Sequence, residues 1–408
     1  MSKPQNSPRF WRKLLHRLNQ HRVFRLAKAW MLFLAFVAIF ANFIANDVPI
    51  FCRYNGDIQF PVIQQALGNY QFNKTTDWNA PQFSSKLMPL IPYQANTIDP
   101  LNSHFKSPFG SQQIASWRYR HWLGTDQIGR DVLAGMVSGA RVSVVISFLG
   151  IGIAAIIGIL LGSLSGYFGD YRLRWPVWRI VLSIISALLV AWLTYILPLY
   201  FSENGQPAHR LTILFFLLLS YILLQIVMHR IPFGKKRITL PVDLLIMRGV
   251  EVFSAIPKLL LLLVISALFP PSIYTVAVVI GITFWPTITR FTRGEMLKIR
   301  AQEYLASAEM QNIPHWKILL RHAIPNAVGP AMIVIMLGLG NAILAESFLS
   351  FLGIGLPPDV VSWGKLLAAA RTNISAWWLV LFPGLGIFFT IYSANRIGEL
   401  LLEELKAG

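Results

Sequence analysis

The chain has 408 residues, of which 55% are hydrophobic and only 13% are charged. A soluble globular chain carries about twice that charged fraction, so the composition indicates a membrane protein with several spans. The 36 lysines and arginines exceed the 18 acidic residues, giving a net charge of +18. Because the basic residues flank apolar stretches, they indicate membrane topology and not a nucleic-acid partner. Cys52 is the single cysteine, so no internal disulfide can form. The cysteine count does not show in which compartment Cys52 lies.

The first 46 residues predict the orientation of the chain. Residues 1–26 are a basic arm without an acidic residue, and residues 27–46 form an apolar run long enough to cross a bilayer. The positive-inside rule places this arm in the cytoplasm. Because the apolar run is long and starts late, we expect no cleavable targeting segment.

Residues 47–141 are polar and rich in proline, asparagine and aromatic residues. They predict an extracytoplasmic cap of loops and short strands. Near its end, Thr125 is suited to cap a helix, and Asp126 and Arg130 have the spacing of a helical ion pair. We therefore expect an interfacial helix there.

The remaining membrane domain is expected over residues 142–398, followed by a cytoplasmic tail, residues 399–408. Two of its spans form a hairpin, at about residues 177–228, and proline kinks another span at Pro257. Glycines recur every fourth residue at Gly158, Gly162 and Gly166, which predicts a smooth packing face. The expected spans are 27–46, 142–164, 177–200, 211–228, 244–269, 273–291, 327–348 and 376–395. The predicted fold is all-α with about eight spans and both termini in the cytoplasm.

A polar cytoplasmic loop, residues 293–326, separates two of these spans. Apolar positions at helical spacing over 294–310 predict an amphipathic helix. Asn312 tolerates the left-handed conformation that ends helices, and Pro314 suits the first turn of a new one. Residues 303–321 therefore predict a helix, a turn and a short helix, with Pro325 ending the unit before the next span.

This loop has two interpretations from its residues alone. It is either a solvated connector or a docking surface for another protein. The small side chains of Ala306, Ser307 and Ala308, beside Glu303 and Tyr304, would allow close approach of a partner, which favours docking.

The sequence predicts no enzymatic activity of its own. It contains no GxxxxGK[ST], HExxH or GxSxG motif and no cluster with metal-ligand spacing. A secondary transporter driven by an ion gradient is the alternative class. Such a protein would need midplane charges and two related halves, and neither is visible in the sequence.

Four segments carry a resemblance to a known family. Residues 293–326, RGEMLKIRAQEYLASAEMQNIPHWKILLRHAIPN, resemble the EAA loop in permease subunits of ABC importers, most closely the second permease of oligopeptide and dipeptide systems. Residues 121–143, 243–257 and 345–364 resemble further segments of that subfamily, in the same order. The chain departs from the family at Ser307, where alanine is usual, and at Asn312, where glycine is usual. The hairpin between Trp175 and Thr239 is an insertion relative to the family pattern.

The resemblance implies a type I ABC importer transmembrane fold in the inner membrane, with six core helices and the inserted hairpin. It implies half of a pathway for peptides, completed by a second permease in a heterodimer. It also implies two ATP-binding subunits and an extracytoplasmic solute-binding protein, so that ATP is bound by partners and this chain needs no cofactor. Oligopeptides are the expected substrate, with dipeptides, metal chelates and peptide-like antibiotics left open.

The resemblance also assigns roles to residues. ATPase docking is carried over to Glu303, Tyr304, Ala306, Ser307, Ala308, Asn312 and Pro314. A pathway or gate role falls to Glu346, Phe348 and Phe351, with capping an equal alternative for Glu346.

Overall fold

The computed structural model describes residues 8–69, 83–176 and 237–407, with scattered residues between 72 and 80 and between 178 and 226. The chain forms two compact units. The first comprises residues 1–163 and 249–408, and the second comprises residues 164–248. Each unit is considered by itself below.

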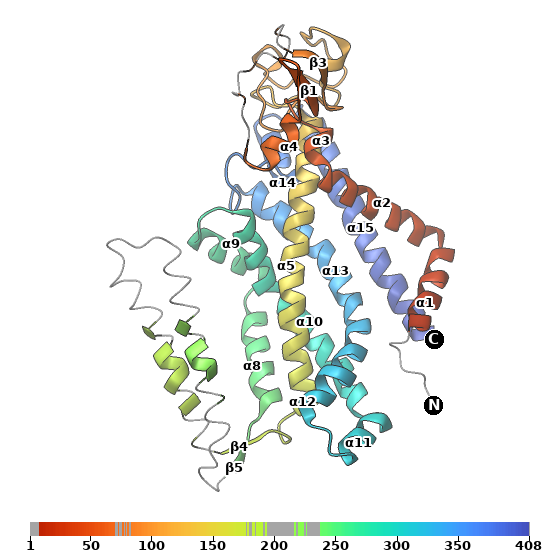
Figure 1. Ribbon diagram of the computed structural model, residues 1–408, viewed down its shortest axis with the longest axis vertical. Coiled ribbons are helices and arrows are strands. Elements are labelled where there is room, and N and C mark those ends of the chain that lie inside the picture. The colour runs from red at the N-terminus through yellow and green to blue at the C-terminus, as the bar shows by residue number, and fades with distance from the viewer. Residues whose placement is uncertain are drawn as a thin grey trace. The chain divides into compact units, whose positions relative to one another are not determined.

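The N-terminal part of the first unit is helical (Figure 1). An amphipathic helix, α1 (Pro8–Gln20), precedes α2 (Arg22–Ile39) and the short α3 (Ala41–Ile44). The first predicted span, residues 27–46, thus corresponds to a helix that begins five residues earlier and breaks at Phe40. Both α1 and α2 pack against α15 (Trp378–Ala407) at the other end of the chain.

The cap contains the expected short strands. A three-stranded antiparallel sheet has the order β2-β1-β3, and Cys52 in its central strand pairs with Gln59 and Lys86. Cys52 is a free, fully buried thiol. The elements of the cap are β1 (Phe51–Tyr54), β2 (Asp57–Gln59), α4 (Pro61–Ala66), β3 (Phe83–Leu87) and the single 3₁₀ turns η1 (Pro100–Asn102) and η2 (Trp117–Tyr119).

The predicted interfacial helix around Thr125 is wrong. Residues 124–131 form turns and an isolated bridge between Thr125 and Asp131. Gly124 and Gly129 have φ angles of +79° and +90°, which a right-handed helix does not allow. At Gly129 an added Cβ would lie 2.0 Å from the Asp99 carbonyl oxygen, so the loop packs too closely for a side chain.

Long helices form the core of the first unit. They are α5 (Val132–Phe168), whose end enters the second unit, α10 (Ile273–Arg300), α13 (Ile324–Phe351) and α15. Helix α13 packs against both α10 and α15, and the short α14 (Trp363–Ala369), which η4 (Ala370–Thr372) extends, covers α13 and α15.

The predicted glycine face of α5 meets α10. A Cβ added at Gly158 would lie 2.6 Å from the Ile288 Cβ, and one at Gly162 would lie 2.6 Å from the Thr289 carbonyl oxygen. Both distances are shorter than real Cβ contacts, so the glycines permit this close approach of backbones.

Proline bends the predicted span 244–269 sharply. Helices α8 (Val242–Ala255) and α9 (Lys258–Leu268) meet at an angle of 87°, with Pro257 as the residue before α9. Among the described residues, four helices are long and apolar enough to cross a membrane, or five if this bent pair counts as one span. The expected total of about eight stays a prediction, because α2, at the first predicted span, is not among these helices, and the spans 177–200 and 211–228 lie largely outside the described residues.

The second unit holds the base of the predicted insertion. Strands β4 (Arg174–Pro176) and β5 (Arg237–Thr239) pair antiparallel, with Arg174 opposite Thr239. The Asp243 carboxylate accepts a hydrogen bond from Ser165, and the Leu244 amide donates to Asp170 at 2.9 Å. The pairing closes the chain on either side of the inserted residues, as expected for an insertion between Trp175 and Thr239.

Candidate functional site

The loop at residues 293–326 contains the predicted helix, turn and short helix, although the amphipathic helix predicted over 294–310 is interrupted at residues 301–302. Helix α10 continues to Arg300, then α11 (Glu303–Met310) is followed by α12 (His315–Ile318). Asn312, between them, has a φ angle of +55°, the left-handed conformation expected for this turn. The Ile313 amide donates to the Ala308 carbonyl at 3.3 Å and closes the end of α11.

Buried leucine and isoleucine side chains hold the loop to the rest of the protein. Leu305 is 1% exposed, Ile318 is fully buried and Leu319 is 1% exposed. Tyr304 accepts a hydrogen bond at 2.9 Å from the amide of Asn326, which adds a polar tie between α11 and α13. The loop is therefore a fixed structural element, so its movement would also move the attached helices.

The exposed surface of α11 includes most of the predicted docking residues. Glu303, Ala306 and Ser307 are exposed, and the Ser307 hydroxyl donates to the Glu303 carbonyl. Pro314 and Asn312 are exposed beside them. Met310 is 79% exposed and adds a large apolar side chain that the sequence analysis did not include.

Ala308 does not belong to this surface. It is only 9% exposed and faces inward with Leu305, so its predicted place on the docking surface is wrong. The physical reason is helical spacing, because residues three apart share a face and Leu305 is the inward anchor. An exposed patch of small residues is left at Ala306 and Ser307.

The predicted end of the loop at Pro325 is also wrong. One continuous helical stretch runs from His315 to Phe351, and Pro325 lies in the first turn of α13. Wider π-type turns, η3 (Leu319–Ala323), precede it. Proline has no N–H to donate, and a π segment in front of it lets the helix continue without the missing bond.

Glu346 lies in α13 and is fully buried. One carboxylate oxygen accepts from Ser143 of α5 at 2.7 Å, and the other accepts from Ser350 at 2.8 Å. These donors are serine side chains, so Glu346 forms a polar tie between helices and not a helix cap, and its pathway or gate role stays a prediction. Phe348 and Phe351 are half-buried, and the Arg371 guanidinium lies 5.1 Å from the Phe351 ring centre.

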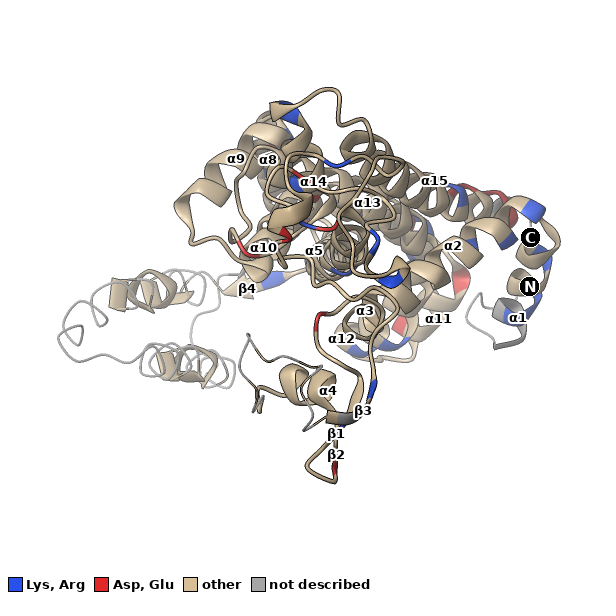
Figure 2. Ribbon diagram, turned by 90° about the horizontal axis from the view of Figure 1, so that it is seen from above, with Lys and Arg blue, Asp and Glu red and all other residues tan. Residues whose placement is uncertain are grey.

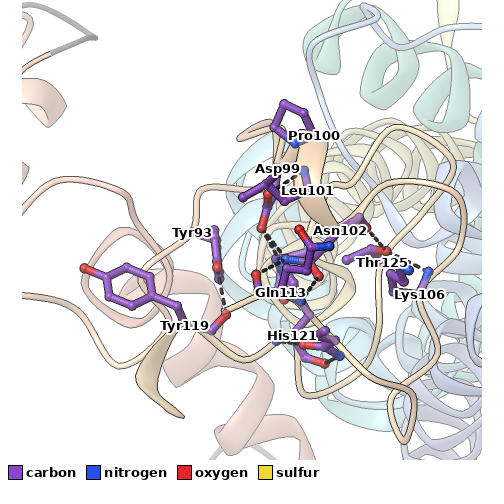
Figure 3. Close-up of polar contacts among 12 residues, drawn as sticks. Tyr93, Asp99, Pro100, Leu101, Asn102, Lys106, Gln113, Tyr119, His121 and Thr125 are labelled. Carbon is purple, nitrogen blue, oxygen red and sulfur yellow. Dashed lines mark hydrogen bonds and ion pairs between the residues drawn. The ribbon is translucent and has the colours of Figure 1, made fainter. Parts of the chain in front are cut away.

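A histidine cluster at the base of the cap was missed by the sequence analysis (Figure 3). His121 is fully buried, and its Nδ1 lies 2.8 Å from Asp131 while its Nε2 lies 3.2 Å from Asp99. The Tyr93 ring stacks on the imidazole at 4.4 Å between ring centres, and its hydroxyl donates to the Tyr119 carbonyl at 2.8 Å.

Hydrogen bonds and nearby charges shift the pKa values of His121 and Asp99. Burial alone would lower the pKa of His121, but the hydrogen bonds and charges of Asp131 and Asp99 outweigh it and raise that pKa above its usual value. Burial likewise works against ionised Asp99, yet hydrogen bonds from Asn102 and His121 lower the pKa of this carboxyl overall. The cluster is a charged clamp that joins loop segments to the start of α5. Its members are separated in sequence and follow no motif, so the only signal in the sequence was His121 shortly before Asp126 and Asp131.

Comparison with known proteins finds a family match over the C-terminal part of the chain. Residues 236–405, which include the loop and Glu346, match the family of binding-protein-dependent transport system inner membrane components. This match and the relatives below support a permease subunit of an ABC importer. That family is a permease component and not itself the catalytic one, and neither the family nor the relatives below support the ion-gradient alternative.

Three relatives illustrate the similarity. The dipeptide transport system permease protein DppC of Alkalihalophilus pseudofirmus is 28% identical over 286 residues, covering 70% of this chain and 71% of the relative. The oligopeptide transport system permease protein OppC of Haemophilus influenzae is 28% identical over 287 residues, covering 70% of each. The peptidoglycan transport system permease protein YejE of Agrobacterium fabrum is 25% identical over 392 residues, covering 89% of this chain and 83% of the relative.

Proposed function

We propose that this permease imports oligopeptides as one half of a heterodimeric pathway, with both termini in the cytoplasm. One of two ATP-binding subunits engages the α11 surface, the other engages the second permease, and a solute-binding protein delivers the peptide outside. ATP binds to the partner subunits, and the permease itself needs no cofactor. The relatives named as dipeptide and oligopeptide permeases support the substrate class.

The exposed surface of α11 is the observation that supports docking. Ala306 and Ser307 present a low surface beside Glu303, while Leu305 and Ile318 fix the same helix from behind. A partner that grips this helix can therefore transmit force without first unfolding the loop. Closing of the ATPase subunits would then rock the attached spans as rigid bodies.

The docking proposal can be tested by one substitution and a matched control. Ala306→Arg places a long charged side chain where a close contact is proposed, and Ala115→Arg makes the same change at an exposed position of the cap. We expect Ala306→Arg to abolish co-purification of the ATPase subunits and peptide uptake, while Ala115→Arg retains both. Normal assembly and uptake by Ala306→Arg would refute docking on this surface.

A second substrate class is supported by the extent of one alignment. The relative named for peptidoglycan transport is similar over 89% of this chain, whereas the dipeptide and oligopeptide relatives are similar over 70%. Peptidoglycan-derived peptides are therefore the second candidate. Competition of muropeptides against a labelled tripeptide in uptake assays decides between the two classes, because only the cognate class should compete at low concentration.

A further inference from the structure

The described part of the N-terminal arm is a continuous basic surface. Between residues 8 and 28 there is no acidic residue, and basic residues recur on both helices. Figure 2 shows Lys and Arg along α1 and the start of α2, near the C-terminal end of the chain. These residues are Arg9, Arg12, Lys13, Arg17, Arg22, Arg25 and Lys28.

One side of α1 is anchored to the protein. Leu14 is 4% exposed and Leu18 is fully buried, and both belong to an apolar cluster that includes Phe24 and Ile397. Arg17 and His21 contact Glu404 of α15 at 3.8 and 3.3 Å. The helix is thus held in place, and Arg12 and Lys13 on it are exposed.

Two arginines and a leucine form an open cavity on this surface. Arg22, Arg25 and Leu26 line a space of about 320 Å³, and Leu26 is 72% exposed. Within the described part of the chain, neither guanidinium makes an ion pair. Two positive charges beside an exposed apolar side chain suit a ligand with an anionic group next to hydrocarbon.

The position of the cavity along α2 identifies that ligand. The first span predicted from the sequence begins at Ala27, which would place Arg22 and Arg25 within two turns of the membrane boundary. This inference rests on the proposed function, in which both termini are cytoplasmic. The cavity then faces the leaflet that carries anionic lipids. We infer that this surface binds the phosphate of an anionic phospholipid, with Leu26 in contact with its acyl chains.

Lipid retention by the full-length chain tests the inference. The purified protein is exchanged into nanodiscs of phosphatidylcholine with a minority of phosphatidylglycerol, and tightly retained lipid is measured by native mass spectrometry. The double variant Arg22→Gln, Arg25→Gln is compared with Lys317→Gln, Arg321→Gln, which removes the same charge from exposed positions of the cytoplasmic loop. We expect phosphatidylglycerol retention to fall on the order of tenfold in the first variant and to persist in the control.

Two outcomes would overturn the inference. Equal retention of phosphatidylglycerol by wild type and the Arg22→Gln, Arg25→Gln variant removes the lipid site. Unchanged lipid retention with loss of co-purifying ATPase subunits assigns this surface to a protein partner instead. Failure of the proposed transport function has a separate readout, absence of peptide uptake by the wild-type complex.

Discussion

Replacing His121 should open the cap. In the native protein this fully buried imidazole lies 2.8 Å from Asp131, whose side chain is 1% exposed. Breaking a buried ion pair by removing one partner costs about 3–5 kcal/mol. The other Asp131 oxygen still accepts from the Ala134 amide at 2.6 Å, which favours the lower end of that range for His121→Ala. His121→Gln can keep one donor, so it should cost less.

Cys52 provides a built-in probe of this opening. It is the only cysteine of the chain, it is fully buried in β1, and burial raises the pKa of its thiol. The strand β3, paired with β1, leads through Ile91 to Tyr93, which stacks on His121. A thiol reagent should therefore label Cys52 only when the cap opens. With a cost of about 3 kcal/mol, His121→Ala should label roughly a hundredfold faster than wild type.

The protection should depend on pH in a defined direction. Folding raises the pKa of His121, so its contribution is complete below the unfolded value of about 6.5 and is lost as pH rises through the folded pKa. Folding lowers the pKa of Asp99, so its contribution is present above about 3.8 and is lost as pH falls through its folded pKa. Protection by the clamp is therefore greatest between those two values.

The ratio of labelling rates between variant and wild type removes the intrinsic pH dependence of the thiol. This ratio should be largest near pH 5.5 and should fall as the solution becomes alkaline, by about one order of magnitude for each 1.4 kcal/mol lost. His104→Asn, at an exposed histidine of the cap with a φ angle of +62°, is the control and should label like wild type. A ratio near one for His121→Ala, or a ratio that grows with pH, would refute the clamp.

Substitutions at four further positions test the packing of the bundle and the loop. Gly158→Ala should lower the melting temperature of the purified chain, because overpacking costs about 1–3 kcal/mol, whereas Gly152→Ala on the same helix has open space and should be neutral or stabilising. Glu346→Leu leaves buried serine hydroxyls without an acceptor, at about 1–3 kcal/mol each, so it should express far worse than Glu346→Gln. Asn312→Gly should transport like wild type and Asn312→Val less well, because β-branched residues resist the left-handed turn, as measured by peptide uptake. Ala308→Arg should destabilise the chain itself, seen as poor recovery before any partner is added, and normal recovery would show that the inward face is open.

The parts of the fold governed by local rules could be predicted from sequence. Apolar runs long enough to cross a bilayer predicted α5, α10, α13 and α15. Helix α5 starts ten residues before its predicted span, because the helix continues beyond the apolar run. The turn at Asn312 followed from the conformational tolerance of asparagine. The bend at Pro257 followed from the missing N–H of proline, but its 87° angle did not, because packing against neighbouring helices sets the angle.

The candidate sites that depend on tertiary contact could not be predicted. Ala308 and Ala306 are chemically identical in sequence, and only the buried position of Leu305 shows which of them faces inward. The Glu346 carboxylate could be identified as unusual, but its partner Ser143 is 203 residues away. The histidine clamp was missed for the same reason, since Asp99 and Asp131 meet His121 only after the loops between them have folded.

These separate observations connect the two sides of the membrane through one element. The helical stretch His315–Phe351 begins just after the proposed docking surface and carries Glu346 toward its other end. Because Glu346 accepts a hydrogen bond from Ser143, a displacement of the loop that this stretch transmits to Glu346 also acts on α5 near the cap. The π-type turns at Leu319–Ala323 are the segment of the stretch with the widest hydrogen-bond spacing, so bending would concentrate there. On the proposed mechanism, a movement of the loop passes through the π segment η3 to the hydrogen-bonded Glu346. Because the helix is stiff on both sides of η3, closing of the ATPase subunits would be detectable at the extracytoplasmic face.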